Sequence, residues 1–201
     1  MFDWLTGWIE EGGSIGVGIL MLAENVFPPI PSELIMPMAG YLAAIGRLHW
    51  LAVLVAGVTG SVLGAWFWYW LGRALGRERL LWLIARWGHW ATITTGETEA
   101  SLRWFEKRGE WAVFLGRMIP IVRTLISVPA GLNRMGQVKF LLLTAAGSLI
   151  WIGALTGAGW VLKTQYARVE DWLDPVTTVI IAAVVVTYVW RVIRLYMRSR
   201  R

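Results

Sequence analysis

Two acids and two bases could do chemistry in this chain, because each lies in an otherwise uncharged, proline-rich stretch: Glu24, Glu33, Arg117 and Arg123. Burial favours the neutral form of a carboxylate, whereas a neighbouring cation favours its charged form. Arginine stays charged, and its planar fork suits bidentate contact with phosphate. The sequence therefore predicts a site for an anionic head group, in which Arg117 and Arg123 bind the phosphate and Glu24 and Glu33 take up and release protons.

Two other interpretations of these residues stay open. The glutamates could pair with the arginines only to hold the two stretches together, although buried ion pairs rarely add net stability. Alternatively, the glutamates could bind a small cation or a drug, with the arginines only structural. The amide of Asn25 could orient Glu24 or satisfy backbone groups freed near the prolines, and the sequence favours neither role.

Six of the seven prolines lie in these same two stretches, 24–40 and 116–131. Proline lacks an N–H and crowds the preceding turn, so neither stretch should form one continuous helix. Irregular, charged backbone at membrane depth is tolerated inside protein or beside a water-filled cavity, and it usually marks a functional site. The predicted scaffold of the site consists of helix-breaking prolines and of glycines at packing or turn positions: Pro28, Pro31, Pro120, Pro129, Gly40 and Gly131.

The composition is that of an integral membrane protein of 201 residues, with 57% hydrophobic residues, 16% charged residues and 15 tryptophans. Soluble domains carry about 25% charged residues. The net charge of +6 does not indicate nucleic acid, because the basic residues lie mostly in loops and the C-terminus, where they set topology and meet anionic lipid. The absence of cysteine excludes disulfides and thiolate metal sites. No nucleophile elbow, metal cluster or phosphate loop is present, so neither an enzyme nor a cofactor or metal is predicted.

Uncharged segments of 23 residues at 50–72 and 140–162 predict two transmembrane helices, and 175–197 predicts a third. Residues 2–11 and 73–110 have an amphipathic pattern that predicts helices in the membrane interface. Small residues at helical spacing in the first two spans predict close helix packing. They are Gly57, Gly60, Ser61 and Gly64 in the first span and Gly153 and Gly157 in the second.

An internal repeat is indicated because a shift of 89 to 91 positions superimposes the two proline stretches and the spans that follow them. The chain then forms a single membrane domain, 1–201, with a first repeat at 12–72 and a second at 111–162. Each repeat begins with a re-entrant helical hairpin, at 14–46 and 111–136. The positive-inside rule places the basic loop 73–110 and the C-terminus in the cytoplasm, so the repeats are inverted. Inverted repeats with discontinuous helices are typical of secondary transporters.

At these residues the sequence resembles the DedA family, which shares a domain with eukaryotic SNARE-associated Golgi (VTT domain) proteins. The motifs are E-N-x-F-P-P-I-P-S-E at Glu24–Glu33, followed by P-x-A-G, and G-R-x-I-P-x-V-R at Gly116–Arg123, followed by P-A-G. The resemblance covers roughly residues 10–165. It implies two opposed re-entrant hairpins, with the family's essential acids falling on Glu24 and Glu33 and its essential arginines on Arg117 and Arg123.

The resemblance also implies movement of lipids between leaflets. Bacterial members are linked to recycling of undecaprenyl phosphate, often with dependence on the proton gradient, and eukaryotic relatives look like phospholipid scramblases. This chain has Pro31-Ser32-Glu33 where some members have Pro-Gly-Asp, which leaves the coupling ion and substrate open. The leading hypothesis is a proton-coupled flippase for undecaprenyl phosphate in a bacterial inner (cytoplasmic) membrane. The alternatives are a phospholipid scramblase and an exporter of small cations or drugs, and homo-oligomerisation is compatible with each.

Overall fold

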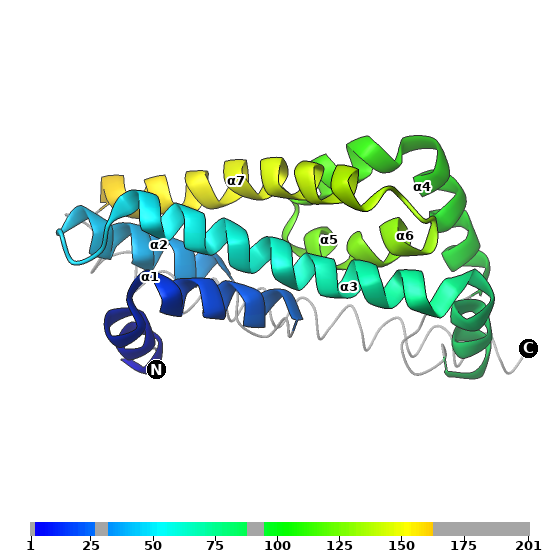
Figure 1. Cartoon of the computed structure of the whole chain (residues 1–201), viewed down its shortest axis with the longest axis horizontal. Coiled ribbons are helices and arrows are strands. Elements are labelled where there is room, and N and C mark those ends of the chain that lie inside the picture. Colours follow the sequence, from blue (N-terminus) through cyan, green and yellow to red (C-terminus); the bar gives the residue numbers. More distant parts are fainter. Residues whose placement is uncertain (1–2, 27–31, 88–94, 163–201) are drawn as a thin grey trace, which may run out of the picture.

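A computed structural model describes residues 3–26, 32–87 and 95–162, and all regular structure within these ranges is helical, as predicted (Figure 1). The predicted span at 175–197 and the scaffold prolines Pro28 and Pro31 lie outside the described residues. The helices are α1 (Asp3–Val26), α2 (Ser32–Ala44), α3 (Trp50–Trp87), α4 (Thr95–Gly116), α5 (Pro120–Leu125), α6 (Ser127–Leu132) and α7 (Gln137–Val161).

Two of these helices, α3 over Trp50–Trp82 and α7 over Gln137–Val161, are long and apolar enough to cross a membrane. About a third of each apolar window is buried, 33% in α3 and 28% in α7, so most of their apolar surface faces outward and suits contact with lipid. The predicted span 50–72 does not end at a loop. Its helix continues through Gly76, whose φ of 71° is open to glycine, and bends there into the amphipathic stretch that ends at Trp87.

The first half of the chain contains a helix pair around the first proline stretch. α1 bends at Gly13, whose φ is 57°, so the amphipathic turns before it diverge from the apolar turns after it. The described part of α1 ends at Val26 and α2 begins at Ser32, and the predicted helix break between them falls on residues 27–31, outside the described residues. Pro37, however, lies inside α2 without ending it. α1 and α2 contact each other; a re-entrant course through the membrane stays a prediction.

The second half breaks its helices in a different way. α4 ends at Gly116, and residues 117–119 form an irregular turn before α5. Pro120 is the first residue of α5, a position where a missing N–H costs nothing. Ile126 separates α5 from α6, and Pro129 is the third residue of α6. The second half therefore has two short helices, α5 and α6, where the first half has the single helix α2.

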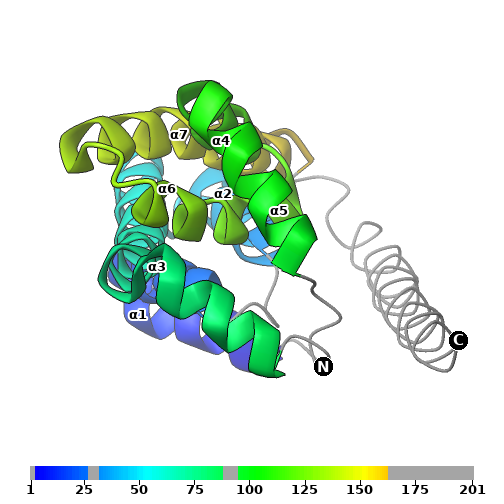
Figure 2. The ribbon, with the colours of Figure 1, turned by 90° about the vertical axis from the view of Figure 1, so that its right-hand side faces the viewer.

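In each half of the chain, a helix that contains a proline packs on the long helix of the other half. α2 packs on α7, and α6 packs on α3 (Figures 1 and 2). Glycine makes both contacts close, because a Cβ on Gly40 would overlap the carbonyl oxygen of Thr156 and one on Gly131 would overlap that of Tyr69. The long helix of each half also packs on the first arm of its own half, α3 on α1 and α7 on α4. The two halves are thus interlocked.

The small residues of α3 pack as predicted, since Gly57 lies against Met36, Gly60 against Gly18 and Gly64 against Asn25. The same prediction is wrong for α7 among the described residues. A Cβ on Gly153 or Gly157 would meet no described atom within 4 Å. The close contact of α7 with α2 instead includes Gly159, which lies against the carbonyl of Pro37.

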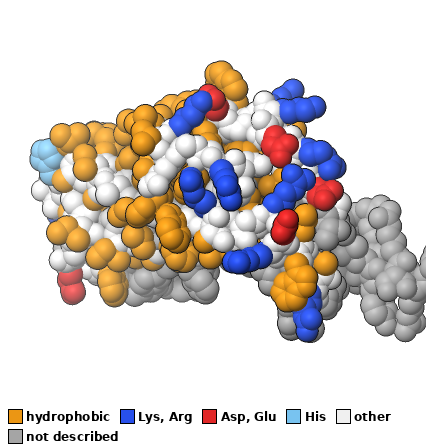
Figure 3. Space-filling view, turned by 45° about the vertical axis from the view of Figure 1, so that its right-hand side comes forward, with side chains coloured by type: hydrophobic (Ala, Val, Ile, Leu, Met, Phe, Trp, Pro, Cys, Tyr) orange, Lys and Arg blue, Asp and Glu red, His pale blue; other side chains and the backbone are white. Residues whose placement is uncertain are grey.

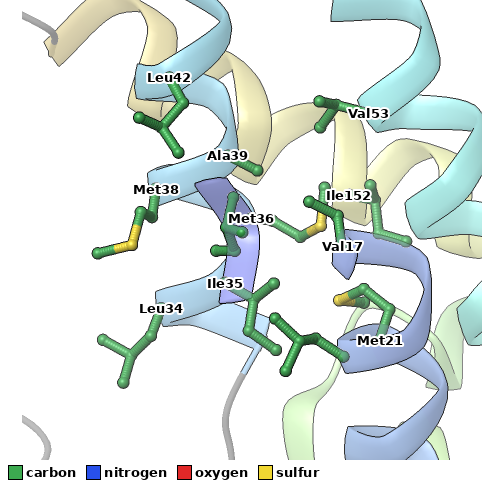
Figure 4. Close-up of a cluster of buried hydrophobic side chains, with 12 residues drawn as sticks. Val17, Met21, Leu34, Ile35, Met36, Met38, Ala39, Leu42, Val53 and Ile152 are labelled. Carbon is green, nitrogen blue, oxygen red and sulfur yellow. The ribbon is translucent and has the colours of Figure 1, made fainter. Parts of the chain in front are cut away.

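The apolar core near α2 draws side chains from four helices (Figure 4). Val17 and Met21 come from α1, and Ile35 and Met36 come from the facing side of α2. α3 and α7 close this cluster with Val53 and Ile152. A second cluster around Tyr69 and Phe140, whose rings stack with centroids 4.5 Å apart, holds the α4–α6 end.

Charged side chains gather toward the end of the molecule formed by α4 and the last turns of α3, whereas the rest of the described surface in view carries mostly hydrophobic and uncharged atoms (Figure 3). Arg77 of α3 and Glu106 of α4 form an exposed ion pair at 3.4 Å. Lys139 of α7 pairs with Glu110 of α4. This end includes most of the described part of the predicted interfacial segment 73–110.

Candidate functional site

The structure brings together one acid and one base of the predicted site, Glu24 at the end of α1 and Arg123 in α5. Their side chains form a hydrogen-bonded ion pair and are 6% and 4% exposed, respectively. The pair joins the two halves of the chain across 99 positions. Because a buried charge is costly without its partner, each residue of this pair stabilises the other.

Asn25 lies beside Glu24, and the backbone near Pro28 and Pro31, which its amide could also have satisfied, lies outside the described residues. Its buried amide Nδ2 lies 3.4 Å from Oε2 of Glu24 and 3.4 Å from the carbonyl oxygen of Met21 in its own helix. The amide also donates to the hydroxyl of Ser61 in α3, at 3.1 Å. The indole of Trp68 in turn donates to the backbone oxygen of Asn25 at 2.8 Å, which satisfies one carbonyl at the end of α1.

A hydrogen bond between two serines continues this polar chain to the second long helix. The hydroxyls of Ser61 in α3 and Ser148 in α7 lie 3.3 Å apart, and either can donate. Both are buried. Glu24 is therefore connected through Asn25 to the place where α3 and α7 meet.

Arg117 lies in the irregular turn after α4, and no carboxylate pairs with it among the residues that the structure describes. Its side chain is among the most deeply buried, with 1% of the residue exposed. Nη2 donates to the hydroxyl of Ser127 at 2.8 Å, and the guanidinium carbon lies 6.0 Å from the centre of the Phe140 ring. Nε and Nη1 have no hydrogen-bond partner in the described ranges. An unneutralised buried guanidinium with free donors is chemically suited to bind an anion.

Glu33 lies in the first turn of α2, where a negative charge interacts favourably with the helix dipole. Its Oε1 is buried without a hydrogen-bond partner in ranges 3–26, 32–87 and 95–162. Within those ranges, no ion pair connects it to Arg117 or Arg123. The four charged residues thus comprise one closed pair and two groups with unused hydrogen-bonding atoms.

Several polar residues of the site lie in apolar helices and were not predicted as part of it. Ser61 was interpreted as a packing residue, and Ser127, Thr144 and Ser148 were not singled out, yet all four are buried. Thr144 is fully buried in α7 with no described hydrogen-bond partner for its hydroxyl. Their signal in the sequence is weak because isolated hydroxyls are common in membrane helices, where they also bond to backbone.

Comparison with known proteins identifies the family. The model of the VTT domain family matches residues 30–161, which include α2 to α7. The chain therefore belongs to the VTT domain (DedA) family of membrane proteins, and the resemblance drawn from its motifs is confirmed. No solved structure matches the chain.

Several curated relatives match over nearly the whole chain. Undecaprenyl phosphate transporter A of Staphylococcus aureus is 31% identical over 98% of this chain and 97% of its own length. The protein of the same name from Bacillus subtilis is 34% identical over 93% of this chain and 91% of its own length. An alkaline phosphatase-like protein of Lactococcus lactis subsp. cremoris is 37% identical over 90% of this chain and 85% of its own length.

Proposed function

We propose that this protein moves undecaprenyl phosphate between the leaflets of a bacterial inner membrane and that proton uptake drives the movement. The observation that carries the proposal is Arg117, a buried guanidinium whose Nε and Nη1 have no partner among the described residues. A lipid phosphate would supply the missing charge and acceptors. The names of the relatives from S. aureus and B. subtilis support this choice of substrate.

The ion pair between Glu24 and Arg123 supplies the proposed coupling. While Glu24 is ionised, it occupies Arg123. Protonation of Glu24 removes the charge that holds Arg123, so this second guanidinium becomes available to the phosphate bound at Arg117. Loss of the proton on the other side restores the pair and expels the phosphate. Glu33, with its unpartnered Oε1, is proposed as the second proton-accepting group.

The proposed membrane arrangement follows the charge pattern. The two proline stretches form opposed re-entrant hairpins, 14–46 and 111–136, and the segment 73–110 and the C-terminus face the cytoplasm. The buried pair of Glu24 with Arg123 supports this arrangement, because it lies where one hairpin meets the other. An anion entering from either side would then reach Arg117 and Arg123 between the hairpins.

Transport of labelled undecaprenyl phosphate into proteoliposomes, with and without a pH gradient, tests the proposal. We expect gradient-dependent transport by the wild type and its loss in Arg117→Lys, because an ammonium cannot replace the planar fork. The matched control is Arg103→Lys in α4, whose exposed partner Glu99 lies 3.3 Å away and which should transport normally.

Other outcomes would replace the proposal. No transport by well-folded wild-type protein would exclude this substrate. Movement of labelled phospholipid instead would identify a scramblase. Normal transport of undecaprenyl phosphate by Arg117→Lys would show that the planar fork of Arg117 is not needed and would remove this residue from the proposed phosphate site. Release of inorganic phosphate from the labelled lipid would indicate an enzyme, as the name of the L. lactis relative suggests for that protein.

A further inference from the structure

The second long helix carries a buried hydroxyl on the face that Arg117 contacts. Thr144 of α7 has no exposed surface, and its Oγ1 has no hydrogen-bond partner among the described residues. Buried threonines in helices usually donate to the carbonyl four residues earlier, as Thr156 does to Ile152 at 2.7 Å. Thr144 leaves this local bond unused, so its hydroxyl is free to donate elsewhere.

Arg117 contacts the α7 residues on both sides of Thr144. Its guanidinium carbon lies 6.0 Å from the Phe140 ring, and a Cβ built on Gly147 would meet its Cβ and Cγ at 2.9 and 3.2 Å. Thr144 is one turn after Phe140 and one turn before Gly147, so the three residues share one face of the helix. Arg117 therefore lies across the face that carries the free hydroxyl.

A second hydroxyl reaches the guanidinium from α6. Ser127, also fully buried, accepts a hydrogen bond from Nη2 of Arg117 at 2.8 Å. A hydroxyl that accepts through its oxygen keeps its own hydrogen available for donation. Ser127 thus reaches Arg117 from α6, and Thr144 belongs to the face of α7 that Arg117 contacts through Phe140 and Gly147.

We propose that Thr144 and Ser127 complete, together with Arg117, the binding site for the phosphate group of the transported lipid. This inference rests on the proposed function and assigns two further specificity-determining residues to it. The donors are Nε and Nη1 of Arg117 and the two hydroxyls, all from buried side chains. A phosphate monoester presents three terminal oxygens and a diester only two, so the monoester offers this set of donors more acceptor atoms.

Equilibrium binding of farnesyl phosphate to the purified full-length protein in detergent tests the inference, with farnesol as the ligand that lacks phosphate. We expect Thr144→Val to weaken farnesyl phosphate binding roughly 10- to 100-fold, because a hydrogen bond to a charged group is lost. Thr144→Ser should restore the affinity to within about twofold, since it keeps the hydroxyl. The control is Thr156→Val, equally buried in α7 but bonded to its own helix, which should bind as the wild type does.

The melting temperature without ligand separates a binding role from a structural one. Thr144→Val removes a buried hydroxyl that has no described partner, so its Tm should equal or exceed that of the wild type even as binding weakens. Unchanged binding by Thr144→Val, with binding lost in Arg117→Gln, would overturn the inference and leave the proposed function intact. A lowered Tm of Thr144→Val with an unchanged affinity for farnesyl phosphate would also overturn the inference, because Thr144 would then serve only in helix packing. If wild-type protein binds farnesyl phosphate no better than farnesol, the proposed function itself fails.

Discussion

Breaking the buried pair of Glu24 and Arg123 should destabilise the protein far more than breaking an exposed pair. Glu24→Gln keeps the shape of the side chain but leaves Arg123, 4% exposed, without a counter-charge. Removing one partner of a buried ion pair costs about 3–5 kcal/mol. Glu106→Gln breaks the pair with Arg77, in which the side chains are 48% and 45% exposed, and should cost less than about 1 kcal/mol.

The double variant Glu24→Gln/Arg123→Met distinguishes a pair from two independent residues. Once Arg123 is also neutral, no buried charge is left uncompensated, so the double variant should lose at least about 1 kcal/mol less stability than the sum of the single variants. The free energy of unfolding in mixed micelles measures all three variants. Two outcomes would refute the pairing and with it the proposed coupling. One is that the stability losses of the two single variants add up to that of the double variant, and the other is that Glu24→Gln lowers the free energy of unfolding no more than Glu106→Gln does. A stable double variant should still be inactive in transport.

Three further changes test separate contacts. Gly131→Ala should lower stability by about 1–3 kcal/mol, because its Cβ would overlap the carbonyl of Tyr69, whereas Gly157→Ala meets no described atom and should be neutral in the same thermal melt. Asn25→Leu removes a donor to ionised Glu24, which favours the protonated form, so the pH profile of transport should move to higher pH; an unmoved profile contradicts this. In this cysteine-free chain, single cysteines at exposed positions report topology. Impermeant maleimide should label Arg79→Cys only from the cytoplasm and His49→Cys only from outside.

The sequence predicted the long helices and the helix breaks because both follow from local chemistry. An uncharged run of 23 residues has few alternatives to a membrane helix, and clustered prolines interrupt any helix. Prediction from the sequence was less successful where contacts between helices determine the structure. Pro37 sits inside α2, because one proline within a well-packed helix is tolerated. Gly153 and Gly157 have the spacing of a packing motif, yet a Cβ at either position would meet no described atom, because spacing alone does not say which face of a helix is covered.

The charged residues of the candidate site were predictable as a set, but their pairing was not. Charges in uncharged, proline-rich stretches stand out in the sequence, yet Glu24 could have paired with either arginine. The fold brings Arg123 of α5 to Glu24 at the end of α1 and leaves Arg117 in the turn after α4. Thr144 and Ser127 gave no signal because a hydroxyl becomes informative only when its environment shows that it lacks a partner.

Some backbone and hydroxyl contacts match between the two halves of the chain. Gly131 follows Gly40 by 91 positions, and their contacts Thr156 and Tyr69 are separated by 87. Ser148 likewise follows Ser61 by 87, and the hydroxyls of these two residues contact each other.

The charges do not follow this match. The first half contributes acids and the second half contributes arginines, so a backbone arrangement shared by both halves carries opposite charges on its two sides. Pairing Glu24 with Arg123 neutralises one charge from each half, and Arg117 remains without a described counter-ion.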